Sequence, residues 1–272
     1  MNGTDRRPPP RLDTSTPNVA RMLDYILGGK DNFAADREAA EQILAIAPEI
    51  RNMVEETEAF LGRVVRHLAH EGIDQFLALG WGLPTRENVH QVARSVVPGA
   101  RVVYVADDPV ALSHGRALLA TDDATAVVRG DVLHQDELMA DPELRALIDP
   151  DRPTAVLITN ALQFIPDEDD PHKSVALLRD SLAVGSHLVI AHAVFDDHPE
   201  VADPITAVYR RVLSRYGERA ARTRREVLRF FDGMELVEPG FVYARHWRPD
   251  NPLAARRPTR TWTMAGVARK TG

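Results

Sequence analysis

Glycine and acidic residues follow two of the apolar stretches in this sequence, at the positions where a nucleotide-binding site needs them. Gly80 and Gly82 come directly after Ile73–Leu79, and glycines at such a strand-to-helix turn let the backbone approach a ligand. Asp107 follows the next apolar stretch, where a carboxylate can accept two hydrogen bonds from ribose hydroxyls. The third glycine of the dinucleotide fingerprint is missing near Thr85, which argues against a simple NAD-binding fold.

Other residues near the ends of apolar stretches are weaker candidates for ligand binding. Asp108 precedes Pro109 and is better explained as the N-cap of a helix than as a ligand contact. Two later loops could place an acid beside an adenine amino group and bring cofactor and substrate together. Their residues are Gly130, Asp131, Val132, Asn160 and Ala161.

A histidine follows in the next apolar stretch and is the best placed general base. His192 is available in its neutral form near pH 7. With Asp196, Asp197 and His198 it resembles metal-ligand spacing, but a loop enforces no geometry. We therefore interpret the group as a strand-end histidine followed by a polar capping loop, and we predict no metal site.

The elements that must position these residues change in type along the chain. Helical patterns come first, with Thr16 as N-cap and Pro17 in the first turn of the first helix, which Gly28 stops. The next two helices are expected over 34–47 and 48–70. Apolar stretches then alternate with helical ones. The predicted strands are 73–79, 101–105, 125–128, 154–159 and 187–194, and the predicted helices are 86–97, 109–120, 134–148, 171–182 and 199–216.

This alternation predicts a parallel sheet with helices on both faces, which is a doubly wound α/β fold. The end of the chain differs. A short helix near 223–231 leads to strands at 234–237 and 259–267, whose close connection predicts an antiparallel edge on the sheet.

The composition excludes several classes of protein. The chain has 272 residues, a net charge of −7 and no cysteine, which excludes thiolate metal sites, disulfides and a cysteine nucleophile. The acidic balance argues against general nucleic-acid binding. No apolar stretch is long enough to span a membrane, and the N-terminal residues do not read as a signal peptide. We expect a cytoplasmic protein, and leave a homodimer open.

Charged residues are unevenly distributed. The acidic run Asp167–Asp170 precedes Pro171 and is explained by the charge preference of a helix N-terminus. The segment from Arg210 to Arg229 contains eight arginines, both ends included. They form either a solvated helix face or a surface for an acidic substrate or partner.

Several motifs together resemble one family. The segment VARMLDYILGGKDNFAADREAA (Val19–Ala40) and the shorter motifs GLPT, FIPDEDDP and WTMAGVARK are similar to actinomycete S-adenosylmethionine-dependent methyltransferases of mostly unknown substrate. The similarity covers almost the whole chain after the first residues, and GGKDNFAADR is not a generic nucleotide-binding pattern.

The resemblance implies a class I methyltransferase, Rossmann-like fold, with a seven-stranded sheet whose last strand is antiparallel. The polar, proline-containing first residues indicate a flexible tail at 1–13, and the resemblance implies a helical cover at 14–72 that forms one unit with the domain at 73–272. S-adenosylmethionine or S-adenosylhomocysteine would bind beneath that cover, with His192 and Gln163 as the candidate catalytic residues. The residues implied to contact it, besides those at the later strand ends, are Tyr25, Gly29, Lys30, Asn32, Phe33, Gly80, Trp81, Gly82, Asp107 and Asp108.

Four positions depart from the family pattern. Ala78 replaces an acid, Trp81 a small hydroxyl residue, Ala106 the acid that binds ribose, and Gln163 a histidine. Losing a charge-assisted hydrogen bond costs about 1.5–3 kcal/mol. Either Asp107 takes over the ribose, or the site is degenerate and the protein binds another ligand or catalyses a reaction without methyl transfer.

Overall fold

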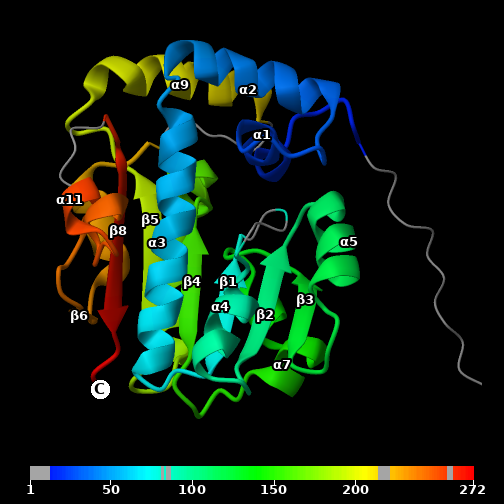
Figure 1. The fold of residues 1–272 in the computed structure, drawn as a ribbon, viewed down its shortest axis with the longest axis vertical. Helices are drawn as coiled ribbons and strands as arrows, with labels where there is room; N and C mark the ends of the chain where they lie inside the picture. Colours follow the sequence, from blue (N-terminus) through cyan, green and yellow to red (C-terminus); the bar gives the residue numbers. More distant parts are fainter. Residues whose placement is uncertain (1–12, 81–82, 84–86, 214–220, 256–259) are drawn as a thin grey trace, which may run out of the picture.

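The chain folds into an eight-stranded mixed sheet with helices on both faces (Figure 1). The computed structural model describes residues 13–80, 83, 87–213, 221–255 and 260–272. Trp81, Gly82 and almost all of the predicted tail lie outside these residues. The strands are β1 (Gln75–Leu79), β2 (Arg101–Ala106), β3 (Thr125–Arg129), β4 (Ala155–Thr159), β5 (His187–Ala193), β6 (Glu235–Leu236), β7 (Val242–Tyr243) and β8 (Thr263–Arg269).

The helices occur where the apolar periodicity places them, in most cases. They are α1 (Val19–Ile26), α2 (Ala34–Ile46), α3 (Ile50–His70), α4 (Val89–Val96), α5 (Pro109–Leu118), α6 (Gln135–Met139), α7 (Pro142–Leu147), α8 (Pro171–Ser181), α9 (Pro199–Val212), α10 (Arg224–Leu228) and α11 (Pro252–Ala255). Among the described residues, no helix is both long and apolar enough to cross a membrane.

The strand order is β3-β2-β1-β4-β5-β8-β6, and β7 pairs with β8 beside this path. The five strands β1 to β5 pair in parallel, and β8 runs antiparallel to β5, with Ile190 opposite Gly266. The predicted antiparallel edge is therefore confirmed. The predicted number of seven strands is wrong, because β7 adds an eighth. This strand has only two residues, which is too short for an apolar pattern to reveal it.

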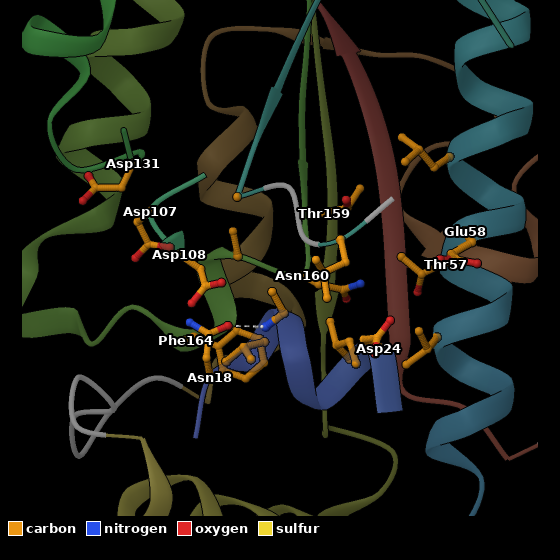
Figure 2. A pocket seen from close by; sticks show the side chains of 18 of the residues that line it. Asn18, Asp24, Thr57, Glu58, Asp107, Asp108, Asp131, Thr159, Asn160 and Phe164 are labelled. Carbon is orange, nitrogen blue, oxygen red and sulfur yellow. Dashed lines mark hydrogen bonds between the residues drawn. The ribbon is translucent and has the colours of Figure 1, made fainter. Parts of the chain in front are cut away.

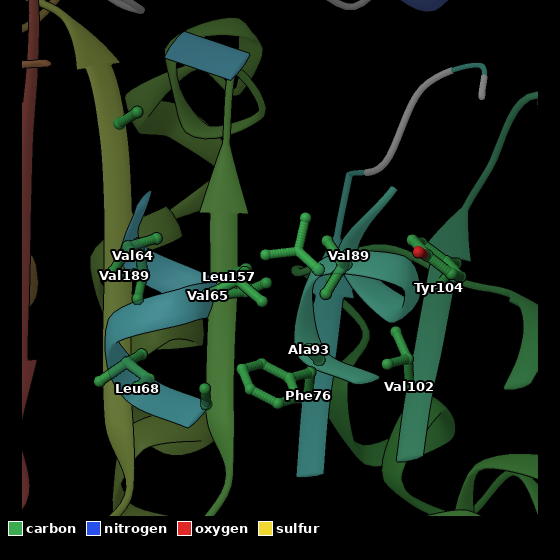
Figure 3. Close-up of a cluster of buried hydrophobic side chains, with 14 of the residues drawn as sticks. Val64, Val65, Leu68, Phe76, Val89, Ala93, Val102, Tyr104, Leu157 and Val189 are labelled. Carbon is green, nitrogen blue, oxygen red and sulfur yellow. The ribbon is translucent and has the colours of Figure 1, made fainter. Parts of the chain in front are cut away.

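Two apolar layers enclose the sheet. Residues of β1 are buried on both faces, as expected for parallel strands between helices. On one face α3 and α4 pack against the strands, and Figure 3 shows Val64, Val65 and Leu68 of α3 beside Leu157 and Val189. The other face is covered by α6, α7, α8 and α10. These layers leave the carboxyl ends of the parallel strands as the edge at which a ligand can bind.

A third apolar cluster lies above that edge. It joins α1, α2, α9 and the first turns of α3, with Trp262 at its base. Figure 1 shows α2 and α9 side by side across the top of the molecule, beyond the end of β4, with α1 beneath α2. Because α3 runs from this cluster down one face of the sheet, it connects the upper helices rigidly to the strands.

Two local expectations are wrong for reasons of capping. The first helix is capped by Asn18, whose side chain accepts a hydrogen bond from the Ala20 N–H, and not by Thr16. The segment predicted as one helix over 134–148 forms α6 and α7. Asp141 accepts hydrogen bonds from Glu143 and Leu144 and starts a new helix with Pro142 in its first turn.

Candidate functional site

A cavity of about 970 Å³ lies between the carboxyl ends of β1 to β4 and the helices α1 and α3. Figure 2 shows its two ends: Asp107 and Asp131 come from the loops after β2 and β3, whereas Thr57 and Glu58 come from α3. Asn160, after β4, lies between these ends. The predicted strand-end residues that line it are Gly80, Asp107, Asp108, Gly130, Asp131, Val132, Asn160 and Ala161.

The turn after β1 requires glycine at its first position. Gly80 has φ +67°, and a Cβ atom there would lie 2.4 Å from the Cβ of Ala161. Any side chain would therefore clash as well as strain the backbone. The close approach of this turn to the loop after β4 brings two strand ends together in the cavity wall.

The acids after β2 and β3 have distinct structural duties. Asp108 caps α5 by accepting hydrogen bonds from Val110 and Ala111, each at 3.0 Å, as predicted. It also lies 3.3 Å from the Arg21 guanidinium of α1. Asp131 accepts hydrogen bonds from the backbone of the two residues just before α6. Asp107 lines the same cavity, next to Asp108 in the chain.

The other end of the cavity contains residues that the motif search missed. Val54, Thr57, Glu58 and Leu61 of α3 line the wall at helical spacing, and Asp24 of α1 lies nearby. This i, i+3, i+4, i+7 pattern mixes polar with apolar side chains on one helix face. That mixture was a readable sign that the face borders a ligand cavity and not only a core.

The segment after α1 wraps around Asp24. Its carboxylate accepts hydrogen bonds from the Asp31 N–H at 2.9 Å and the Asn32 side chain at 2.8 Å. A Cβ at position 29 would lie 2.0 Å from that carboxylate, so Gly29 is needed for the turn, and it also lines the cavity. Four predicted contact residues are not among the described cavity residues: Tyr25, Lys30, Asn32 and Phe33.

Those four residues have other surroundings. The Tyr25 hydroxyl donates to Glu41 on α2, and Lys30 is exposed. The Phe33 ring lies under the Arg21 guanidinium, with 5.3 Å between the guanidinium carbon and the ring centroid. The side chains of Tyr25, Asn32 and Phe33 therefore make contacts within the helical cover, and none of the four is among the described residues of the cavity wall.

The two predicted catalytic residues lie beyond the main cavity. Gln163 accepts a hydrogen bond from the Ala193 N–H at 2.9 Å and lines a second, smaller cavity. His192 is fully buried, and burial lowers its pKa to about 3. Its ring lies 3.5 Å from the Arg222 guanidinium and lines neither cavity among the described residues.

The arginine-rich segment contributes one buried structural group. Arg222 donates to the carbonyl oxygens of Leu162 and Ile165, at 2.7 and 2.8 Å, and to the Asp167 carboxylate. It thereby fixes the loop that supplies Phe164 to the cavity wall. Arg215 and Arg219 lie outside the described residues, and no group of described side chains has the composition of a metal site.

The charge in the main cavity has one sign. Among the described lining residues there are eight acids and no lysine, arginine or histidine. The acids are Asp24, Glu55, Glu58, Glu87, Asp107, Asp108, Asp131 and Asp169. Such a lining favours cationic and neutral ligands over anions, since like charges repel strongly where water is partly excluded.

The family model that describes S-adenosyl methyltransferases matches residues 5–271. The chain belongs to the S-adenosyl methyltransferase family. A DUF574 family protein from Streptomyces avermitilis is 36% identical, with a TM-score of 0.89, over 96% of this chain and all of that one. A candidate methyltransferase from Thermobifida fusca is 42% identical, with a TM-score of 0.90, over 97% of this chain and 99% of that one. No curated protein matches the chain.

More distant structures share only the fold of class I methyltransferases. The plantazolicin methyltransferase BpumL, solved with S-adenosylhomocysteine, is 11% identical with a TM-score of 0.50 over 92% of this chain and 95% of that one. The cofactor of the family is S-adenosylmethionine. The cavity fits such a molecule because a glycine turn, two carboxylates and an open volume of about 970 Å³ meet at the strand ends.

Two of the four departures from the family pattern lie in the core, while Gln163 lines the second cavity and Trp81 is outside the described residues. Ala78 and Ala106 are buried on the sheet face that packs against α3 and α4, at 5% and 2% exposure. Asp107, one residue further along, lines the cavity instead. A carboxylate is therefore still present at the end of β2, shifted by one position.

Proposed function

We propose that this protein transfers a methyl group from S-adenosylmethionine to a small molecule. The observation that carries the proposal is a single cavity with two ends, one at the carboxyl ends of β2 and β3 and one against α1 and α3. The cofactor supplies an electrophilic methyl group when bound. The protein contributes binding and alignment, which can account for much of the catalysis in such a transfer.

In this proposal the strand ends hold the nucleoside. Asp107 accepts hydrogen bonds from the ribose hydroxyls, and Asp131 with Val132 borders the adenine. The backbone at Gly80 approaches the cofactor closely because no Cβ is present. His192 takes no part as a general base in this proposal, because its ring is fully buried and is not among the described residues that line the cavity.

Calorimetric titration with S-adenosylhomocysteine tests the proposal. Asp107→Ala should weaken binding by about tenfold or more, because a charge-assisted hydrogen bond contributes about 1.5–3 kcal/mol. The matched control is Asp123→Ala, which removes an exposed acid from the loop before β3. Its affinity should equal that of the wild type.

The alternative of a degenerate cofactor site predicts another result. Wild-type protein would show no binding at millimolar S-adenosylhomocysteine, and the double change Trp81→Thr with Ala106→Asp would produce a large gain in affinity. Tight wild-type binding that Asp107→Ala leaves unchanged would also reject the assignment of Asp107. The small-molecule acceptor and a cytoplasmic location belong to this proposal, and the oligomeric state stays a prediction.

A further inference from the structure

The second cavity joins the first at the end of β4. Five residues line both: Leu23, Val54, Thr57, Asn160 and Phe164. The hydroxyl of Thr57 is engaged, since it donates to the Met53 carbonyl oxygen at 2.8 Å. Of these five described residues, Asn160 is the one whose polar side chain makes no hydrogen bond to the rest of the described protein.

The backbone of Asn160 is held in an uncommon conformation. Its φ is +57°, in the left-handed region that residues with a side chain seldom adopt, although asparagine does so more readily than most. Strain of this kind persists where the surroundings impose it, and it concentrates at functional sites. Here the loop is held by the contact of Ala161 with Gly80 and by Arg222 on the Leu162 carbonyl oxygen. The amide is thus fixed at the junction of the two cavities.

The smaller cavity, which we call the alcove, is mostly apolar, and Gln163 and Thr263 are its polar lining residues beyond the shared ones. Its volume is about 40 Å³, room for only a few non-hydrogen atoms, because about 10–15 Å³ of such space holds one water molecule. Beyond the shared residues, its apolar lining consists of Ile50, Met53, Ala193, Phe195, Ile205, Tyr209, Ala221 and Trp262. A ligand group that fills it would be short and apolar.

We propose that the alcove and Asn160 form the acceptor subsite, which takes hydroxyl or amine compounds with a short apolar end. The inference rests on the proposed function and adds the class of substrate to it. The apolar end fills the alcove, and the carbonyl oxygen of the Asn160 amide accepts the O–H or N–H of the acceptor heteroatom. Carboxylates are excluded because the described lining of the adjoining cavity carries acids and no basic side chain.

This assignment gives Asn160 a role different from cofactor binding. A residue that oriented the cofactor would alter S-adenosylhomocysteine affinity when changed, whereas an acceptor residue would not. Asn160→Gly separates these roles, because glycine adopts φ +57° without strain and removes only the amide. The variant should keep or slightly raise the midpoint of thermal unfolding.

Saturation-transfer difference NMR tests the subsite with three ligands that share one carbon skeleton. Protein saturated with S-adenosylhomocysteine receives 1-butanol, n-butylamine or butyrate. The terminal methyl of the alcohol and the amine should receive saturation from the protein, and butyrate should receive much less. Ala193→Val narrows the alcove and should abolish the methyl signal, whereas Ala140→Val, at an exposed position after α6, should not.

With Asn160→Gly the signal of the alcohol should fall by about two- to tenfold, the range for one lost hydrogen bond, while the dissociation constant for S-adenosylhomocysteine stays within about twofold. Tenfold weaker cofactor binding in this variant would instead assign Asn160 to cofactor binding. Butyrate contact equal to that of the alcohol, or contact insensitive to Ala193→Val, would overturn the subsite alone. Absence of S-adenosylhomocysteine binding in the wild type would overturn the proposed function and the subsite together.

Discussion

The sheet and the helices above it are held together by different forces. The sheet has two apolar layers, in which Phe76, Leu157 and Val189 are at most 2% exposed. The upper helices share an apolar cluster, but they also meet the sheet through Arg21, a buried cation. Apolar burial stacks layers without fixing direction, whereas hydrogen-bonded charges fix position.

The contacts of Arg21 show what its charge fixes. It lies 3.0 Å from Asp36 of α2 and 3.3 Å from Asp108 at the start of α5, and it donates to the Thr16 carbonyl oxygen at 2.8 Å. Asp36 also accepts the N–H groups of Asn18 and Phe33. This network sets the helical cover directly above the loop that carries Asp107. The sheet therefore supplies stability, and the ion network supplies alignment of the cavity.

The largest expected effect is a loss of global stability from the sheet layers. Phe76→Ala opens a cavity in a fully buried layer and should lower the free energy of unfolding by about 3–5 kcal/mol. Urea denaturation measures the change. Leu118→Ala, at a side chain 60% exposed, is the control and should shift stability by less than about 0.5 kcal/mol. Equal losses in both variants would contradict the assignment of the sheet as the stabilising region.

A smaller loss with a larger effect on binding is expected from the cover. Asp36→Asn keeps the shape of the side chain but removes its charge, so stability should fall by about 1.5–3 kcal/mol. Because the cover then loses its alignment, S-adenosylhomocysteine should bind several-fold more weakly in calorimetry. The control is Glu38→Gln on the exposed face of α2. Unchanged affinity in Asp36→Asn, with stability reduced, would show that the network does not align the cavity.

The smallest expected effect is a change in how the stability of the sheet depends on pH. His187 and His192, both on β5, have pKa values lowered by burial to about 4 and about 3. Since the folded pKa lies below the usual 6.5, the unfolded chain binds more protons between these values. Stability is therefore complete above pH 6.5 and falls as the pH is lowered toward 3.

For His192 this loss is about 1.4 kcal/mol per pH unit below 6.5. Urea denaturation at pH 7.0, 6.0 and 5.0 measures the slope for the wild type and for His192→Gln. The variant should have a shallower slope, because one of the two buried histidines no longer titrates. An unchanged slope would place the acid sensitivity elsewhere in the chain.

Much of the sheet was predictable because its signals are local. Continuous apolar stretches, each followed closely by glycine, an acid or asparagine, placed β1, β2 and β4 within two residues of their observed bounds. Asp108 before Pro109 was predicted as an N-cap and is one. The same pair of residue types at Asp141 and Pro142 was the readable signal for the division between α6 and α7.

The cavity was only partly predictable. Its strand-end acids follow from topology, since parallel strands bring their carboxyl ends to one edge. The wall on α3 and the acid of α1 depend on how helices distant in the sequence pack. Strand position also did not reveal that His192 faces Arg222 and not the cavity, because alternate residues of β5 face opposite sides of the sheet.

The sequence by itself determined most of the elements, the parallel pairing of the first five strands and the place of the glycine turn, because these depend on periodicity and backbone geometry within short segments. Tertiary structure alone decided which charges meet. It buried Arg21 between two carboxylates, withdrew His192 from solvent, and joined an acidic cavity to an apolar alcove at Asn160. The physical reason is that burial and electrostatic environment are properties of packed neighbours, which distance along the chain does not specify.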